Sequence, residues 1–215
     1  MFGDISSATK IDEIKFKNIA FPNDPIHYIA PTYDDMNHIT FLLAKQMRAN
    51  GITADRIVTL AKGGWPMTRS LVDFTKIKEV ASIGVKFYQK LNQRYEVPKI
   101  YQDLPVSVKG ESVILFDDVA DTGKSLVYVK DYLLKAGVKQ VTTVTLFYKS
   151  HSVIKPDFYG PTTAAWIVFP YESRESFSFF QRKWTKEGLS NEEIDSRMKQ
   201  FGARQAWLDE YRLFS

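Results

Sequence analysis

Short apolar runs alternate with amphipathic stretches along most of the chain, and this alternation limits the fold more than any other feature. The apolar runs are rich in β-branched and aromatic side chains, as buried strands are, and they cover residues 56–61, 80–88, 112–116 and 141–148. The amphipathic stretches have helical spacing and cover residues 33–50, the residues after Gly64, and residues 125–135. Strands that alternate with helices need crossover connections, which place parallel strands in one sheet. The sequence therefore predicts an α/β fold with a parallel sheet.

The pattern changes near residue 150, and this change predicts two regions. Residues 1–148 carry the alternation and form the predicted core domain, which includes an irregular segment, 90–110, with prolines and mixed charge. Long irregular segments in compact domains are usually lids or binding loops. Residues 149–215 are first aromatic and proline-rich, and a capping box at Ser190–Glu193 then opens an apolar helical stripe that continues to Leu208. We expect this last helix to serve packing or subunit contact.

Composition restricts the partners of the protein. A chain of 215 residues with 44% apolar content is long enough for one well-packed domain. The net charge of +4 suits an anionic small molecule, and the sequence has neither an arginine-rich arm nor a helix-turn-helix pattern that would indicate nucleic acid. No cysteine is present, which excludes disulfides and thiolate metal sites. The N-terminus lacks the apolar region of a signal peptide, and no run approaches a membrane span, so we expect a cytoplasmic protein without a membrane partner.

The segment Val113–Leu126, VILFDDVADTGKSL, ends in Gly-Lys-Ser as an ATP-binding loop would. Such a loop needs a glycine five residues before the glycine of Gly-Lys-Ser, but Asp118 occupies that position. Residues 122–125 nevertheless end a strand and begin a helix, where backbone N–H groups and the helix dipole favour one anion. The segment therefore predicts a site for a monophosphate, and a kinase or ATPase is a weak alternative.

Two further features indicate what this phosphate belongs to. Asp117 and Asp118 end the predicted strand, where carboxylates can accept hydrogen bonds from two vicinal hydroxyls or hold a hydrated Mg²⁺. Hydroxyls together with a phosphate describe a ribose phosphate. In LAKGGWP, residues 60–66, glycines allow backbone N–H groups to approach an anion and Lys62 adds positive charge. This loop is a second candidate anion site.

Read together, these motifs resemble those of the type I phosphoribosyltransferases, which use phosphoribosyl pyrophosphate (PRPP). VILFDDVADTGKS is similar to the PRPP signature of the family, and LAKGGWP is similar to its pyrophosphate loop. The resemblance implies a parallel sheet with helices on both faces, a small hood and, in this chain, a C-terminal helical extension. It implies that Asp117 and Asp118 bind the ribose hydroxyls and Mg²⁺. The implied 5′-phosphate contacts are Asp121, Thr122, Gly123, Lys124 and Ser125. The implied pyrophosphate contacts are Ala61, Lys62, Gly63 and Gly64, with a cis peptide at Ala61–Lys62.

The text after residue 141 resembles the hood of the 6-oxopurine members of this family. The resemblance implies that the Lys149 ammonium donates to the purine O6, that Trp166 stacks on the base, and that the Ile167 backbone addresses the base edge. The alternatives are that Lys149 is a solvated strand end and that Trp166 is a core residue. Glu172 stands where the family usually has an aspartate that helps to bind the metal, so its assignment as a third metal ligand depends on a departure from the pattern.

The resemblance implies transfer of ribose 5-phosphate from PRPP to a purine base, with release of pyrophosphate, in purine salvage. Hypoxanthine, guanine and xanthine are the expected acceptors, Mg²⁺ the expected cofactor, and a homodimer or higher homo-oligomer the expected assembly. Asp121 is the implied general base near N7 of the purine; its role as a helix cap is an alternative, and the two roles can coexist. The segment 90–110 would close over PRPP to exclude water. Adenine as the acceptor and a non-catalytic PRPP-binding regulator both stay open as alternatives.

Overall fold

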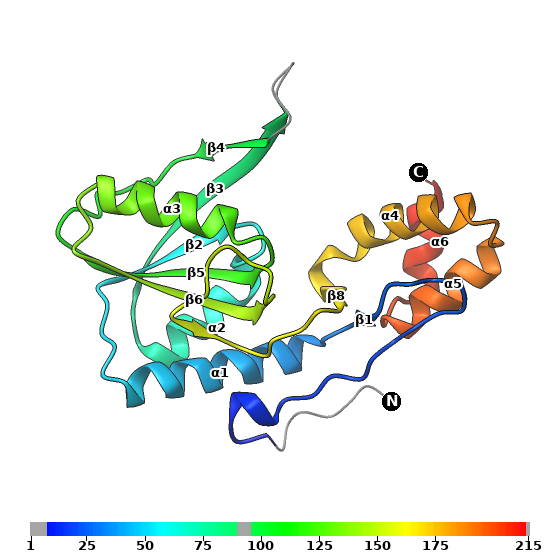
Figure 1. The fold of residues 1–215 in the computed structure, drawn as a ribbon, viewed down its shortest axis with the longest axis horizontal. Coiled ribbons are helices and arrows are strands. Elements are labelled where there is room, and N and C mark those ends of the chain that lie inside the picture. The colour runs from blue at the N-terminus through cyan, green and yellow to red at the C-terminus, as the bar shows by residue number, and fades with distance from the viewer. Residues whose placement is uncertain (1–7, 90–95, 214–215) are drawn as a thin grey trace. The chain divides into compact units, whose positions relative to one another are not determined.

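The computed structural model describes residues 8–89 and 96–213, which divide into two compact units (Figure 1). The sheet unit contains Ser7–Ile14 and Met36–Thr163, and the hood unit contains Lys15–Asp35 and Ala164–Ser215. This division differs from the predicted regions 1–148 and 149–215. The reason is a pairing between distant segments, because the short strand β1 (Tyr28–Ile29) pairs with β8 (Trp166–Ile167) and so draws an N-terminal segment into the hood unit.

The sheet unit is built on a six-stranded sheet with the strand order β4-β3-β2-β5-β6-β7. Its strands are β2 (Arg56–Ala61), β3 (Glu79–Gln89), β4 (Glu96–Gln102), β5 (Ser112–Ala120), β6 (Gln140–Tyr148) and β7 (Phe158–Tyr159). All neighbouring pairs are parallel except β3 and β4, which are antiparallel. The predicted parallel α/β sheet is therefore confirmed.

Helices cover both faces of this sheet, as the resemblance implied. Figure 1 shows α3 (Lys124–Lys135) on one face and α1 (Tyr33–Ala49) with α2 (Trp65–Thr75) on the other. The α3 face is closed by apolar side chains from both layers, including Leu115 on β5 and Val129 and Leu133 on α3, all fully buried. α2 follows β2 and α3 follows β5, each after a short loop, so the N-termini of these two helices lie at the carboxyl ends of those strands.

The prediction of an irregular segment at 90–110 is wrong in part. Residues 96–102 form strand β4, which pairs with β3 in an antiparallel register that places Pro98 opposite Phe87. β4 is the first strand in the sheet order and has one strand partner among the described residues. An edge strand tolerates proline and charge, which is why its sequence lacks a clear strand pattern. Residues 90–95 lie outside the described residues, so the lid expectation for them stays a prediction.

The hood unit combines the β1–β8 pair with three helices: α4 (Ser173–Lys186), α5 (Asn191–Gln200) and α6 (Gln205–Leu213). The single C-terminal stripe predicted from Ser190 to Leu208 is wrong, because α5 ends before Gly202, whose φ of 90° belongs to a helix terminus, and α6 then begins anew. The capping box that starts α5 is confirmed, since Ser190 accepts from the Glu193 N–H and Glu193 accepts from the Ser190 N–H.

Sequence reasoning missed α4 altogether. Its sequence is rich in aromatic and polar residues, yet Phe177, Phe180 and Trp184 recur at helical spacing and are buried. They pack with Phe21 and Tyr28, which come from the N-terminal segment. Because part of this core is supplied by residues far away in the sequence, the local pattern of residues 173–186 alone did not indicate a helix.

A buried ion pair also holds the hood unit together. The Asp24 carboxylate has a fully buried side chain and accepts hydrogen bonds from Lys183 Nζ at 2.6 Å and from the Tyr28 hydroxyl at 2.7 Å. Burial by itself raises the pKa of Asp24. The hydrogen bonds from Lys183 and Tyr28 have the larger, opposite effect, so the pKa falls to about 2. The folded hood unit therefore strongly favours the ionised carboxylate.

Candidate functional site

The two predicted anion loops follow neighbouring strands, β2 and β5. From β2 the chain crosses to β3 on one side, and from β5 it crosses to β6 on the other. The connections therefore diverge between β2 and β5, and in open α/β sheets this divergence creates a crevice at the carboxyl ends of the strands where ligands bind. Residues 61–64 and 121–125 both lie at these ends, so the fold brings the two sequence motifs together.

The loop after β2 lies directly against Asp118, near the carboxyl end of β5. A Cβ atom added to Gly63 would lie 2.3 Å from Asp118 Oδ2, and one added to Gly64 would lie 2.5 Å from Thr59 Oγ1 and 2.9 Å from the Phe116 carbonyl oxygen. Both glycines are therefore required by close approach, which the sequence could only suggest. The cis peptide expected at Ala61–Lys62 is present, and the Lys62 side chain that follows it is exposed.

The loop after β5 ends at the N-terminus of α3, where Gly123 takes a φ of +74°. A Cβ atom at this position would lie 2.2 Å from Ser152 Oγ and 2.8 Å from Ile154 Cγ2, so glycine is required for space as well as for conformation. Asp121 and Thr122 are exposed in this loop. α3 has 12 residues and its N-cap residue makes no side-chain cap hydrogen bond, so the N-terminus of the helix presents N–H groups that suit one phosphate.

β5 is longer than predicted and includes both aspartates. Its register with β2 ends at Thr59 and Phe116, whereas its pairing with β6 continues through Asp117 to Ala120. Asp118 is 7% exposed, and its N–H donates to Asp117 Oδ1 at 3.0 Å. The pair is thus fixed on a rigid strand and is not part of a mobile loop.

The aspartate pair fits a magnesium ion that is held partly by substrate. Mg²⁺ is commonly bound by one or two carboxylates together with water and substrate phosphates. Within residues 8–89 and 96–213 no group of three or more histidine, aspartate or glutamate side chains is arranged as a metal site, so the structure does not assemble a complete protein cage. Glu172, the predicted third ligand, is in the hood unit, in a 3₁₀ turn (Pro170–Glu172) before α4.

Lys149 follows β6 and is 7% exposed, so the alternative of a solvated strand end is wrong. Burial lowers the pKa of its ammonium, and the negative charge of Asp121 partly opposes this effect. Backbone hydrogen bonds tie the segment to the phosphate loop: the Lys149 N–H donates to the Ala120 carbonyl at 3.1 Å, and the Val153 N–H donates to the Thr122 carbonyl at 3.0 Å. These two hydrogen bonds hold the segment that contains Lys149 next to the predicted phosphate loop.

Sequence reasoning missed His151, whose Nε2 lies 3.1 Å from Asp121 Oδ1. Both side chains are exposed. The sequence offered one indication of this contact: His151 follows β6, which is the parallel neighbour of β5, so the loops after the two strands lie side by side. The contact gives the predicted general base an orienting neighbour.

In the hood unit, Trp166 is 43% exposed, so the alternative of a core residue is wrong. The Trp166 N–H donates to the His27 carbonyl at 2.8 Å, and the Val168 N–H donates to the Ile29 carbonyl at 2.9 Å. Alternate residues of a parallel strand face the partner strand, so the N–H and carbonyl of Ile167 point to the side away from β1. This arrangement suits a residue that addresses the edge of a ligand through its backbone.

Comparison with known proteins identifies the family. The sequence profile described as the phosphoribosyl transferase domain matches residues 32–174, which is well over half of the chain. The chain belongs to this family. The match supports the resemblance described above independently of the quoted motifs. The matched residues include both anion loops, Lys149 and the β8 strand.

Three similar proteins are named as purine, hypoxanthine-guanine or xanthine-guanine phosphoribosyltransferases, and a fourth is a hypothetical protein. A hypoxanthine-guanine phosphoribosyltransferase of Aquifex aeolicus is 31% identical over 110 residues, which is 50% of this chain and 62% of that protein. A xanthine-guanine phosphoribosyltransferase of Gluconobacter oxydans is 23% identical over 71% of this chain and 89% of its own length. The solved purine phosphoribosyltransferase of Pyrococcus horikoshii is 32% identical with a TM-score of 0.61, over 67% of this chain and 93% of that one. The solved hypothetical protein from Neisseria gonorrhoeae with bound ppGpp is 25% identical, with a TM-score of 0.64 over 70% of this chain and 92% of that one.

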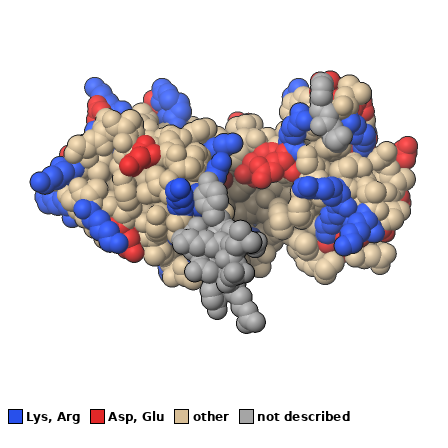
Figure 2. Space-filling view, turned by 90° about the horizontal axis from the view of Figure 1, so that it is seen from above, with Lys and Arg blue, Asp and Glu red and all other residues tan. Residues whose placement is uncertain are grey.

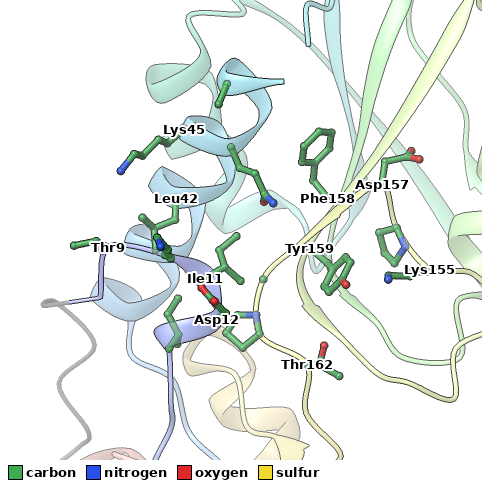
Figure 3. Close-up of a pocket in the computed structure, with 17 residues that line it drawn as sticks. Thr9, Ile11, Asp12, Leu42, Lys45, Lys155, Asp157, Phe158, Tyr159 and Thr162 are labelled. Atoms are coloured by element: carbon green, nitrogen blue, oxygen red, sulfur yellow. The ribbon is translucent and has the colours of Figure 1, made fainter. Parts of the chain in front are cut away.

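Other surface features lie outside the phosphoribosyltransferase motifs. On the face shown in Figure 2, basic and acidic side chains of the described residues are interspersed. A cavity of about 1010 Å³ in the sheet unit is bounded by the turn η1 (Ile11–Glu13), α1 and residues 155–162, and Figure 3 shows Ile11, Leu42 and Tyr159 on its three walls. The cavity contains none of the predicted site residues. Within the described part of the chain, no helix is both long and apolar enough to cross a bilayer.

Proposed function

We propose that the protein transfers ribose 5-phosphate from PRPP to a 6-oxopurine base, namely hypoxanthine, guanine or xanthine, and releases pyrophosphate. The observation that carries this proposal is the contact between the loop after β2 and β5, in which the Asp118 carboxylate lies against Gly63. A 5′-phosphate at residues 121–125 and a diphosphate at residues 61–64 would then lie on either side of the ribose hydroxyls. We place the reaction in purine salvage, in the cytoplasm, and in a homodimer or higher homo-oligomer.

The donor side of the reaction follows from charge and geometry. Residues 122–125 would bind the 5′-phosphate through backbone N–H groups, while Lys62 and the neighbouring glycines would bind the pyrophosphate. Asp117 and Asp118 would accept hydrogen bonds from the ribose hydroxyls and would hold Mg²⁺. When bound, Mg²⁺ supplies positive charge that stabilises the leaving pyrophosphate. No protein nucleophile is needed, because positioning and electrostatic stabilisation of an oxocarbenium-like transition state suffice.

Asp121 is the proposed general base for the purine nitrogen. Its carboxylate lies within reach of His151 Nε2 at 3.1 Å and within electrostatic range of Lys149. The contact with His151 fixes the orientation of the Asp121 carboxylate, as a general base requires. His151 does not enter the reaction in this proposal and only positions Asp121.

The acceptor side uses three kinds of contact. Lys149 would donate to O6, Ile167 would address the base edge through its backbone, and Trp166 would stack on the ring. An ammonium is a donor only, so it favours a carbonyl oxygen over the exocyclic amino group of adenine. Support for a 6-oxopurine also comes from relatives that are named hypoxanthine-guanine and xanthine-guanine phosphoribosyltransferases. Adenine is the second candidate acceptor, because Lys149 alone separates the two classes.

The test is pyrophosphate release measured with PRPP, Mg²⁺ and a panel of hypoxanthine, guanine, xanthine and adenine. We expect release with the three 6-oxopurines and at least tenfold lower kcat/KM with adenine. Release only with adenine would refute the 6-oxopurine assignment but keep the transferase. Binding of PRPP without release for any base would indicate a regulator, and ATP hydrolysis that does not require PRPP would refute the donor assignment.

A further inference from the structure

An aromatic side chain of α4 contacts Trp166 from outside the part of the chain that matches the family. α4 buries Phe177, Phe180 and Trp184, whereas Phe179 lies off this stripe and is 37% exposed. Its ring stacks on the Trp166 indole with ring centroids 5.0 Å apart and an interplanar angle of 21°. The family match ends at residue 174, so the stack joins a residue within the match to one in the C-terminal extension.

We propose that Phe179 is a positioning residue for the acceptor base, because it supports one face of the Trp166 indole and leaves the rest of that side chain available to a purine. The inference rests on the proposed function, in which Trp166 stacks on the base. Phe179 itself does not touch the base. Its effect is to fix the plane against which the base stacks.

The support for Phe179 is itself rigid. Its ring packs edge-to-face on Phe180, with centroids 5.2 Å apart and an angle of 77°. Phe180 is 1% exposed and stacks on Trp184 at 4.6 Å and 17°. A continuous set of aromatic contacts therefore runs from the core of the hood unit to the Trp166 indole.

The main chain of Trp166 is fixed as well. Its N–H donates to the His27 carbonyl at 2.8 Å, and its Cα is in register with that of Tyr28, which is fully buried. Trp166 thus has a fixed backbone and a supported ring, while 43% of the residue stays exposed. A side chain that is already ordered loses less conformational entropy when a ligand binds, which increases affinity without adding a contact.

The arrangement assigns a role to the C-terminal extension. Stacking does not distinguish exocyclic groups, so Phe179 should affect all purines alike and should not alter the preference that Lys149 sets. It should not affect PRPP either, because the predicted donor contacts belong to the sheet unit. The extension would therefore adjust affinity for the base alone.

The experiment compares Phe179→Ala, Phe179→Leu and Phe179→Tyr in the full-length protein by steady-state pyrophosphate release. We expect Phe179→Ala to raise the KM for guanine, hypoxanthine and xanthine by the same factor, roughly threefold to tenfold, with the KM for PRPP unchanged. Phe179→Leu, which keeps apolar volume but not a flat ring, should show a smaller increase, and Phe179→Tyr should restore wild-type values. Trp207→Leu is the matched control, because Trp207 on α6 is similarly exposed at 39% and lies under the Arg204 guanidinium.

Thermal melting of each variant separates positioning from folding. If Phe179→Ala does not fold, the other two variants decide: a higher base KM in Phe179→Leu than in Phe179→Tyr supports the inference, and equal values overturn it. Wild-type base KM in a folded Phe179→Ala protein, an equal rise in the KM for PRPP, or the same effect in Trp207→Leu would each overturn the inference while the proposed function stands. Failure of the wild-type protein to release pyrophosphate with any purine would instead refute the proposed function.

Discussion

The sheet unit and the hood unit hold their predicted ligand contacts in different ways. In the sheet unit, the donor contacts lie in loops at the ends of β2 and β5, and close packing of glycine and aspartate fixes them. In the hood unit, the proposed acceptor contacts Trp166 and Ile167 lie on a two-residue strand that depends on aromatic side chains and a buried ion pair. A donor that is the same in every phosphoribosyl transfer can be bound by backbone geometry, whereas a variable acceptor needs side chains that can be exchanged. The following predictions test this contrast, from the largest expected effect to the smallest.

Neutralising both aspartates at the end of β5 should nearly abolish turnover. In Asp117→Asn with Asp118→Asn, the ribose hydroxyls and Mg²⁺ lose their charged acceptors, and we expect kcat/KM for PRPP to fall by on the order of a hundredfold or more. Thermal melting should change little, because the substitution keeps the shape of both side chains. Asp131→Asn, an exposed aspartate on α3, is the control and should leave kcat/KM unchanged. Wild-type kinetics in the double variant would falsify the donor site.

Adding one methyl group to the pyrophosphate loop should disturb the donor site through its packing. In Gly63→Ala the new Cβ would lie 2.3 Å from Asp118 Oδ2, so the carboxylate has to move. A displacement of about 1 Å in a positioned group can reduce rates on the order of a hundredfold, and we expect kcat/KM for PRPP to fall by roughly that factor.

Gly51→Ala is the control for Gly63→Ala. Its new methyl group meets nothing within 4 Å, but the φ of +67° makes the substitution strained. It should lower the free energy of unfolding by about 1 kcal/mol and leave kcat/KM unchanged. If both variants lose activity to the same extent, the effect is general destabilisation and the close contact has no special role.

Removing the Lys149 side chain should change base preference and nothing on the donor side. The backbone hydrogen bonds of this residue persist in Lys149→Ala, so the phosphate loop should keep its shape. In the wild-type protein we expect a preference for hypoxanthine over adenine between about tenfold and a hundredfold. In Lys149→Ala this preference should fall towards unity, with the KM for PRPP unchanged. Competition assays with both bases measure this ratio directly. The control is Lys155→Ala, an exposed lysine near the same loop, and an equal loss of preference there would contradict the assignment.

The ion pair of the hood unit should make its stability sensitive to acid. The pKa of Asp24 is about 2 in the folded protein and about 3.9 in an unfolded chain. The folded pKa is the lower one, so the stabilisation, about 2.5 kcal/mol, is complete above about pH 5 and is lost as the pH falls through 2. Asp24→Asn should lose about this amount at pH 7 and should no longer show this part of the acid dependence.

Denaturant unfolding followed by tryptophan fluorescence measures this effect, since Trp184 Nε1 lies 3.3 Å from Asp24 Oδ2. Glu187→Gln is the matched control, because Glu187 lies 4.0 Å from the same lysine, Lys183, but is partly exposed. Exposed pairs contribute little, so the change should stay below about 1 kcal/mol. An Asp24→Asn protein with an unchanged free energy of unfolding would show that the aromatic core alone holds the hood unit.

The local structure of the two candidate anion loops could be predicted from sequence because each loop is one continuous segment. In VILFDDVADTGKS one continuous segment supplies the strand, both aspartates, the turn and the start of α3, and backbone geometry links them. Residues 60–66 likewise supply a strand end, a glycine loop and the start of α2. The alternation of strands and helices then determined that these two segments lie at the same edge of a parallel sheet.

What the tertiary structure alone decided depends on contacts between residues far apart in the chain. The β1–β8 pair, the burial of α4 against Phe21 and Tyr28, and the stack of Phe179 on Trp166 have no pattern within any one segment. β4 was missed because an edge strand pairs on one side and needs no regular apolar alternation. The contact of His151 with Asp121 likewise arises because two strand ends meet. Local sequence fixes backbone conformation and hydrophobic period, but a side chain far away in the chain becomes a neighbour only when the whole core is packed.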